Sequence, residues 1–470
     1  MHYVCNLFCN FGPEIIPIYI NMKNLRKTII AFVSCLLLLN VLLTNTSCLE
    51  KNLYNEDIID TVLTKASPVD KLDTTQTWVL TSQSVYTIMA NINVNAKKLQ
   101  ILTENPREKG TAAVVTQTDI ADGQSVTLTA SYESLRTKLY AALVDGEGAY
   151  TVTEFSTSAK NVNFNNTLFV SEHLAYKPEP QAYAYCFEEE FPEPGDYDFN
   201  DVVLNISQER VAENAIQLNV TLAAVGSTSQ LASAIRLVDY EYEDIDSVKT
   251  IGGVTFNKDV PSSILVVMKK DVDKLLLKGR NNEAVINLFA DAHWATGDNL
   301  PENYGIITRK EYNVAKNSSN KSQVYVPRTI SYLIYFKDGS RLNNFTLDTL
   351  DPFMIADYNG SSWEVHLNEY RAAQTLYEYT SANLKNKHLP WALKVPLNTW
   401  EVSEVQNKKT VTVNRYFRHP LSGVNIGFYI KDKEALFGAY ATRGHAFGVW
   451  ASDHTQALDW YLYPLENYVF

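Results

Sequence analysis

The residues most able to do chemistry gather in one acidic stretch, residues 188–204, which ends in an apolar run. Seven of its side chains are carboxylates, and all seven precede Val202. Pro192, Pro194 and Gly195 argue against a helix, because proline lacks a donor N–H and glycine is conformationally loose. The stretch is therefore predicted to be a loop that leads into a strand.

An extended loop would place Asp196, Asp198 and Asn200 on one face, because successive side chains of an extended segment point to opposite faces. The three residues stand at the first, third and fifth positions of an EF-hand-like calcium loop, which binds its ion through oxygen atoms. The match then fails, because Asp201 replaces the glycine at the sixth position and Ser207 replaces the glutamate at the twelfth. The pattern predicts half a calcium loop and not an EF-hand.

The remaining ligands would come from neighbouring carboxylates. We predict a calcium site formed by Asp196, Asp198, Asn200 and Asp201 together with Glu188. Three nearby glutamates could serve in place of Glu188: Glu189, Glu190 and Glu193. Clustering this many carboxylates without a cation costs repulsion. The alternative is a solvated acidic turn whose aspartates accept hydrogen bonds from nearby backbone N–H groups.

No catalytic motif accompanies the acidic stretch. The sequence lacks Gly-x-Ser-x-Gly, His-Glu-x-x-His, phosphate-binding glycine loops and Cys-x-x-Cys zinc spacing. Paired carboxylates could serve a glycosidase, but any acidic protein offers such pairs. Several histidines are scattered singly and are expected to be structural: His293, His366, His388, His445 and His454. We therefore expect a protein that is not an enzyme.

The N-terminal region has the layout of a secretory leader. A basic segment at residues 23–27 precedes an apolar run at residues 28–43, and signal peptides show this order of charge and apolar core. Met22 is the expected start, so residues 1–21 are predicted to be a non-native extension. A transmembrane anchor is the alternative, but the run is somewhat short because a bilayer takes ~20 apolar residues.

The leader ends at Thr46-Ser47-Cys48, which resembles a bacterial lipobox whose cysteine is lipidated and becomes the new N-terminus. Asn45 departs from the aliphatic residue usual at its position. The resemblance implies a signal peptide over residues 22–47 and a lipid anchor on Cys48. We expect the protein to be attached to the cell outer membrane, on its surface or periplasmic face.

Composition supports an extracytoplasmic β protein. The protein has 470 residues, a net charge of −12, 28 tyrosines and a hydrophobic fraction of 46%. This fraction is that of an ordinary globular protein with a real core. A nucleic-acid partner is not expected, because phosphate binding needs clustered Lys and Arg.

The order of short β-rich runs suggests two folded regions. Residues 77–157 read as a small β-sandwich, because strand-like runs alternate there with turn residues. Residues 183–470 read as a larger antiparallel β-rich domain with a few short helices, one of them at residues 434–440. A tether at 48–76 and a linker at 158–182 would join these parts. The predicted fold class is mainly β.

One part of this pattern resembles a known family. Phe187-Glu188 followed by Gly195-Asp196-Tyr197-Asp198-Phe199-Asn200-Asp201 closely resembles the signature of the LruC domain of secreted and outer-membrane lipoproteins, often from Bacteroidota. Further motifs look like the domain of unknown function that forms its C-terminal part: Asp351-Pro352-Phe353, Glu364-Val365-His366-Leu367, the run from His388 to Pro396, and Asp459-Trp460-Tyr461. The resemblance covers roughly residues 183–465.

The LruC resemblance implies a cellular location but no activity, because the biochemical role of the family is essentially uncharacterised. Together with the acidic stretch it favours a non-enzymatic surface or periplasmic module for binding or adhesion, stabilised by calcium, whose ligand is a glycan or a protein. One alternative is a carbohydrate-binding or carbohydrate-active envelope protein that uses Trp294 or Trp363. Another is a structural subunit of a surface appendage.

Overall fold

The computed structural model describes most of the protein that follows the predicted tether. The described residues are 72–108, 110–164, 171–189, 196–227, 229–257, 271–296, 328–358, 361–367, 375–376, 390–397, 401–406, 409–414, 435–465 and 467–468. All of them belong to one compact unit, Leu63–Phe470. The predicted leader, the lipobox cysteine Cys48 and most of the tether lie outside the described residues.

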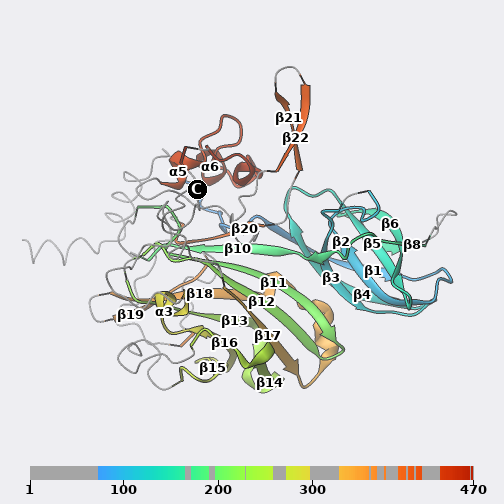
Figure 1. Ribbon diagram of the computed structural model, residues 1–470, viewed down its shortest axis with the longest axis horizontal. Helices are drawn as coiled ribbons and strands as arrows, with labels where there is room; N and C mark the ends of the chain where they lie inside the picture. Colours follow the sequence, from blue (N-terminus) through green and yellow to red (C-terminus); the bar gives the residue numbers. More distant parts are fainter. Residues whose placement is uncertain are drawn as a thin grey trace, which may run out of the picture. The chain divides into compact units, whose positions relative to one another are not determined.

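About half of the described residues lie in strands, nearly all of them antiparallel and with few short helices between them, which confirms the predicted mainly β class. The first region is a sandwich of two sheets, seen in blue to cyan in Figure 1. One sheet has the order β4-β1-β7, with β1 at Thr81–Met89, β4 at Ser125–Glu133 and β7 at Asn161–Asn163. The other has the order β8-β6-β5-β2-β3-β9, with β2 at Ala96–Leu102, β3 at Ala113–Asp119, β5 at Lys138–Asp145, β6 at Ala149–Ser156, β8 at Glu172–His173 and β9 at Glu179–Pro180.

Alternating side chains of the sandwich strands form its core. Tyr86 and Ile88 of β1 point inward while Val85 and Met89 are exposed, as the period of two along a strand requires. The inward residues join one buried cluster with those of β2, β4 and β5. Burying such apolar surface stabilises a fold by about 25 cal/mol per Å², so this core holds the two sheets together.

The stretch 158–182, predicted to be a linker, contributes three short strands to the sandwich. Strand β7 pairs parallel to β1, β8 pairs with β6, and β9 pairs parallel to β3. Pro178 precedes strand β9, and Pro180 ends it at the sheet edge. Edge positions tolerate proline because a missing N–H breaks no ladder there.

The larger region contains two further sheets. The first has the order β14-β17-β12-β11-β10-β20, with β10 at Ala182–Phe187, β11 at Val202–Ala212, β12 at Ala215–Ala224, β14 at Ile245–Thr250, β17 at Arg328–Phe336 and β20 at Ala392–Pro396. The second has the order β15-β16-β13-β18-β19, with β13 at Leu231–Glu241, β15 at Leu276–Lys278, β16 at Glu283–Phe289, β18 at Leu350–Tyr358 and β19 at Ser361–Val365. Strands β21 (Glu401–Gln406) and β22 (Lys409–Asn414) form a separate hairpin.

Helices in the described residues are short, as predicted. The α-helices are α3 at Ala292–Thr296, α5 at Leu436–Ala439 and α6 at Phe447–Ser452. The 3-10 turns are η1 at Tyr242–Asp244, η2 at Ile251–Gly253, η6 at Gly339–Asn344, η7 at Leu347–Thr349 and η9 at Trp460–Leu462. Helix α5 lies within the segment 434–440 for which a short helix was expected.

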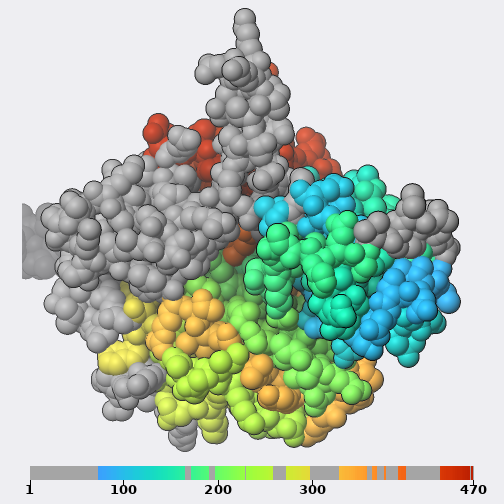
Figure 2. Space-filling model, turned by 45° about the vertical axis from the view of Figure 1, so that its right-hand side comes forward, coloured from blue at the N-terminus to red at the C-terminus, as the bar shows by residue number. Residues whose placement is uncertain are grey.

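A buried lysine joins the sandwich to the larger region. Lys394 of β20 contacts the carboxylate of Asp348 and donates to the Leu347 carbonyl (3.0 Å). The hydroxyl of Thr81 in β1 donates to the same Asp348 carboxylate (2.9 Å). In the space-filling view the cyan surface of the sandwich adjoins the green surface of the larger region (Figure 2). The two β regions are thus connected by a hydrogen bond from Thr81 to a carboxylate that is itself paired with Lys394, as well as through the backbone.

Candidate functional site

The acidic stretch spans the end of one strand pair. Strands β10 and β11 are antiparallel partners, and Phe187 lies opposite Val202 at the end of their ladder. Residues 188–201, here called the acidic loop, leave β10 and return to β11 across this point; residues 190–195 within it lie outside the described part of the protein. The hydrogen-bonded ladder therefore fixes both ends of the loop beside each other.

Three of the predicted ligands come together. Glu188, Asp196 and Asp198 each offer a carboxylate oxygen, and these oxygens lie within 4.8 Å of one another. Glu188 and Asp198 are only 1% and 5% exposed, whereas Asp196 is exposed. Two ligands of a Ca²⁺ ion at 2.3–2.6 Å stand at most about 5 Å apart, so the three oxygens fit around one such ion.

The other two predicted ligands make contacts inside the loop. The side-chain amide nitrogen of Asn200 contacts Asp198 Oδ2, and the Asn200 backbone N–H donates to Asp198 Oδ1 (3.1 Å). Asp201 Oδ2 accepts the backbone N–H of Glu189 (2.6 Å). Asn200 and Asp201 thus brace the loop, and Asp201 is not in the group of converging carboxylates.

The backbone of the loop departs from the extended conformation that the sequence suggested. Tyr197 and Phe199 adopt left-handed conformations, with φ of 59° and 55°. Such positions are uncommon for residues with a side chain, and each costs on the order of 1–3 kcal/mol. Both aromatic side chains are buried, so packing holds the two strained residues in place.

Tyr197 connects the loop to the C-terminal segment. Its carbonyl accepts the N–H of Leu436 at the start of α5 (2.8 Å). Its ring lies 6.5 Å from the ring of Trp391 and 6.5 Å from that of Phe437, measured between centroids. The position of the acidic loop is therefore coupled to the position of α5.

Gly226 makes room for the loop. Its N–H donates to the Asn200 carbonyl (2.8 Å). A Cβ atom on Gly226 would lie 1.6 Å from Asn200 Oδ1 and 2.9 Å from the Asn200 carbonyl oxygen. No side chain fits this space unless Asn200 moves, so glycine is required here by close approach.

Burial and repulsion between like charges raise the pKa values of two carboxyl groups in the acidic loop. Burial, and then the charges of Asp201, Asp198 and Asp196, raise the pKa of Glu188 well above its ordinary value. Burial, and then the charges of Glu189 and Asp198, raise the pKa of Asp201 in the same way. Burial and like charges both disfavour the ionised carboxylate. The loop therefore favours either bound protons or a bound cation.

A serine and a histidine lie beside the loop without forming a catalytic pair. The Ser227 hydroxyl donates to Glu189 Oε2 (2.5 Å). His293 Nε2 lies 2.9 Å from the Ser227 carbonyl oxygen and not at its hydroxyl, and burial lowers the pKa of His293 to about 4. Activation of a serine needs its hydroxyl within reach of a base such as histidine, and this histidine does not supply it.

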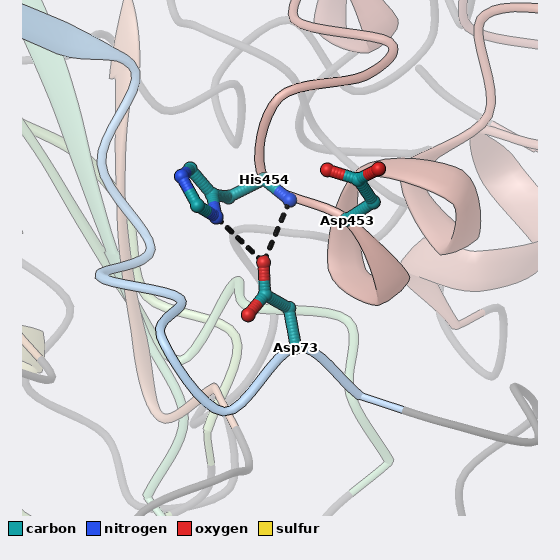
Figure 3. A group of neighbouring side chains, drawn as sticks. All are labelled: Asp73, Asp453 and His454. Carbon is teal, nitrogen blue, oxygen red and sulfur yellow. Dashed lines mark hydrogen bonds and ion pairs between the residues drawn. The ribbon is translucent and has the colours of Figure 1, made fainter.

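A second group of potential ligands was not predicted. Asp73, Asp453 and His454 also place ligand atoms within 4.8 Å of one another (Figure 3). His454 Nδ1 lies 2.6 Å from Asp73 Oδ2, and the His454 N–H donates to the same oxygen (3.0 Å). Residues so far apart in sequence have no spacing signal, because only the fold brings the two segments together.

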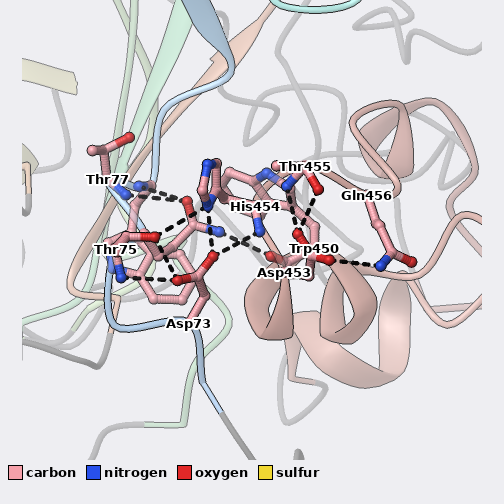
Figure 4. Close-up of polar contacts among 10 residues, drawn as sticks. Asp73, Thr75, Thr77, Trp450, Asp453, His454, Thr455 and Gln456 are labelled. Atoms are coloured by element: carbon pink, nitrogen blue, oxygen red, sulfur yellow. Dashed lines mark hydrogen bonds and ion pairs between the residues drawn. The ribbon is translucent and has the colours of Figure 1, made fainter.

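The partners of this second group explain it as a structural contact. Thr75 donates to Asp73 Oδ1 through its N–H (2.8 Å) and its hydroxyl (2.6 Å). Asp453 accepts hydrogen bonds from Thr455 and Gln456 (Figure 4). The hydrogen bonds of His454 and Thr75 lower the pKa of Asp73 below its usual range. The group fastens residues 72–78 to the end of α6.

Aromatic packing reinforces the same connection. The buried Trp78 ring meets the Trp450 ring edge-on at 5.6 Å between centroids and lies 6.3 Å from Phe447. The side-chain amide of Gln76 donates to the Trp450 carbonyl (2.9 Å). The tryptophans proposed for glycan contact, Trp294 of α3 and Trp363 of β19, are both half-buried.

One known family model matches part of the sequence. Residues 214–426 match the family model described as a domain of unknown function, DUF4842. This agrees with the expectation of a domain of unknown function in the C-terminal part, but the match begins after the acidic loop. No curated protein sequence matches the protein.

One solved structure resembles the fold distantly. It is described as a "Putative lipoprotein from Bacteroides ovatus", with 14% sequence identity, a TM-score of 0.46 and coverage of 80% of this chain and 99% of that chain. A likeness at this level carries no argument about function. Within the described residues, no helix has the length and apolar character needed to cross a membrane.

Proposed function

We propose that the protein is a lipoprotein of the cell envelope that acts as a non-enzymatic binding or adhesion module and holds Ca²⁺ in its acidic loop. The observation that supports this proposal most directly is that Glu188, Asp196 and Asp198 each place a carboxylate oxygen within 4.8 Å of the other two. The lipobox-like Thr46-Ser47-Cys48 and the LruC-like signature support the location, with Cys48 as the lipidated residue in the outer membrane.

The electrostatics of the loop support a cation. Within the described residues, no lysine or arginine forms an ion pair with Glu188, Asp196 or Asp201. A divalent ion would neutralise carboxylates that burial and mutual repulsion otherwise keep protonated. Glu188, Asp196 and Asp198 would hold the ion, while Asn200 and Asp201 keep the loop in shape.

The role proposed for the ion is mechanical. It would fasten the end of β10 to the acidic loop, and Tyr197 extends that connection to α5. Calcium sites in extracellular modules bind in the range of about 10⁻⁴–10⁻³ M, which suits a structural ion in a calcium-rich exterior. A rigid module of this kind is suited to presenting a binding surface to a glycan or a protein.

Isothermal titration tests the proposal directly. The full-length protein, purified in detergent and stripped of metal, is titrated with CaCl₂ beside the Asp196→Ala/Asp198→Ala variant. We expect one binding event per protein molecule in the unaltered protein and none in the variant. Asp453→Asn serves as the control, because it alters the second group of potential ligands and leaves the acidic loop intact.

The outcome separates three cases. Binding lost only in the double variant supports the acidic loop as the site. Binding lost only in Asp453→Asn moves the site to the second group of ligands. If the unaltered protein binds no calcium at millimolar concentration, the metal proposal fails and only the predicted location on the cell envelope remains.

A further inference from the structure

A buried histidine in the second sheet of the larger region lies between two carboxylates. His366 Nδ1 lies 2.8 Å from Asp351 Oδ2 of β18, and His366 Nε2 lies 3.0 Å from Glu364 Oε2 of β19. All three side chains are at most 3% exposed. The imidazole ring stacks on Phe353 at 4.6 Å between centroids. The histidine thus bridges two neighbouring strands from within the core.

The two contacts fix the protonation of the ring. An ionised carboxylate only accepts hydrogen bonds, and a neutral imidazole carries a proton on one nitrogen alone. Contact of both nitrogens with carboxylate oxygens therefore requires the imidazolium form, in which both nitrogens donate.

The surrounding charges are consistent with that form. Arg236 of β13 contacts Asp351 Oδ2 (2.9 Å) and also Glu283 of β16 (3.2 Å), which is partly exposed. We call Asp351, Glu364, His366 and Arg236 the His366 network. With Glu283 included, three carboxylates face Arg236 and His366, and this excess of negative charge favours the charged form of His366. Buried charges persist in proteins chiefly when they are paired in this way.

The network holds a distant piece of backbone. Glu364 Oε2 accepts the N–H of Thr375 (2.7 Å), and Glu364 Oε1 accepts the N–H of Leu376 (2.6 Å). The Thr375 carbonyl accepts the N–H of Arg280 (2.8 Å). Leu376 packs against a buried cluster of the second sheet that includes Phe353. Glu364 thus supplies two of the contacts that keep Thr375 and Leu376 docked, beside the hydrogen bond from Arg280 and the packing of Leu376.

We propose that His366 is a charge-dependent clasp: its imidazolium fixes Glu364 in the orientation that binds the backbone of Thr375 and Leu376, and loss of its proton releases them from the sheet. The clasp is independent of the calcium proposal, because its contacts involve other strands. It is a device for keeping residues 375–376 docked across the neutral range and letting them detach in alkali.

The direction of the pH response follows from the charges that face His366. Burial alone would lower the pKa of His366, but the carboxylates of Asp351 and Glu364 outweigh it and raise the pKa to about 9. A pKa raised above its unfolded value stabilises the folded state below the unfolded value, and this contribution is lost as the pH rises through the folded value. The stabilising contribution therefore falls between the ordinary value of 6.5 and about 9, and in the folded protein the ring loses its proton only as the pH passes about 9.

Amide hydrogen exchange of Thr375 and Leu376 tests the clasp. Exchange is compared with amides of β2 in the same sample, which corrects for the intrinsic effect of pH. In the full-length protein we expect protection at pH 7 and its loss as the pH passes about 9. In His366→Gln we expect about tenfold faster exchange already at pH 7, because a charge-assisted hydrogen bond to Glu364 is lost.

The control is His293→Gln, which alters another buried histidine, whose Nε2 contacts a backbone carbonyl oxygen. Equal protection of residues 375–376 in His366→Gln and the unaltered protein at pH 7 would overturn the proposal. If His366→Gln does not fold, nitrogen NMR of the unaltered protein decides instead. Two protonated ring nitrogens on His366 at pH 7 support the clasp, and a neutral ring refutes it.

Discussion

The acidic loop and the His366 network are both groups of buried carboxylates, and they are balanced in opposite ways. In the His366 network every carboxylate contacts a cation that the protein itself provides. In the acidic loop the charges that face Glu188 are other carboxylates, and they raise its pKa. Among the described residues the protein itself provides the cations of the first group, which we call the complete group, whereas no lysine or arginine pairs with Glu188, Asp196 or Asp201 of the second, which we call the incomplete group.

Two further acids, Glu133 and Asp348, also contact a cation of the protein. Glu133 contacts Arg136, and Asp348 contacts Lys394, in both cases with most of the charged atoms removed from solvent. Lone buried charges are costly, and paired ones are tolerated. Within the part of the protein that the structure describes, the acidic loop differs from these pairs, because no lysine or arginine pairs with Glu188, Asp196 or Asp201. The comparison makes four predictions.

Removing a cation from the complete group has the largest expected effect. Arg236→Met leaves Asp351 buried with His366 as its one cationic contact among the residues described, and breaking a buried pair in this way costs about 3–5 kcal/mol. We expect that loss in the free energy of unfolding measured by urea titration, with or without calcium. Lys274→Met, which removes an exposed ion pair with Asp271, is the control and should change stability by less than about 1 kcal/mol. A small effect of Arg236→Met would show that the network is not tightly paired.

Changing the shape of the incomplete group without changing its charge has the next largest effect. Gly226→Ala would put a Cβ against Asn200, and overpacking of this kind costs about 1–3 kcal/mol. Since Asn200 braces Asp198, we expect calcium affinity to fall as well. Calorimetry beside Gly438→Ala, whose added Cβ meets nothing within 4 Å, separates this effect from a general loss of stability. Unchanged affinity in Gly226→Ala would mean that the loop geometry does not set the site.

The sequence predicted the class of fold because strand patterns are local. Alternating runs such as Gln217–Val225 show which face of a strand is buried, and this segment forms β12. The short strands after residue 158 escaped notice because strands of two or three residues carry no period. Their pairing depends on edges that the sandwich has already built, so it is a tertiary effect.

The site was predictable to the extent that its residues are adjacent in sequence. Asp196 and Asp198 could be read as potential ligands from spacing, and Glu188 from its place at the other end of the loop. The left-handed conformations at Tyr197 and Phe199 were missed, because the packing of a residue such as Tyr197 involves Trp391 and Phe437, which are far away in sequence. His366 was read as an isolated structural histidine, since its proximity to Asp351 arises from the pairing of β18 with β19.

The third prediction concerns how the stability of the metal-free protein depends on pH. The pKa values of Glu188 and Asp201 lie above their ordinary values of 4.5 and 3.8, so above those values the folded state binds more protons than the unfolded state. Stability of the metal-free protein should therefore fall as the pH rises from about 4 to 7, on the order of 1–2 kcal/mol. Saturating calcium should remove this slope.

Unfolding by urea at several pH values, with EGTA or with CaCl₂, measures the difference between the two slopes. Because other carboxylates, such as Asp348, have lowered pKa values and respond in the opposite sense, the difference is more informative than either curve. Calcium binding should also release protons, which appears as a dependence of the calorimetric heat on the buffer. Parallel curves and no proton release would contradict an ion at Glu188.

Neutralising one carboxylate of the incomplete group is expected to change the free energy of unfolding least. The direction of this change is what distinguishes the two groups. Glu188→Gln keeps an oxygen that can accept the N–H of Phe199, as Glu188 Oε2 does now (3.2 Å). It also removes the cost of keeping this carboxyl group protonated in the folded state at a pH at which the unfolded state releases the proton. We expect the metal-free protein at pH 7 to be stabilised by about 1 kcal/mol, whereas stabilisation by calcium should be reduced. The matched change Glu364→Gln in the complete group should destabilise the protein, because it leaves His366 without one of its two carboxylates. Opposite signs for the same chemical change would establish that the fold balances one group internally and leaves the other for a cation, and equal signs would remove that distinction.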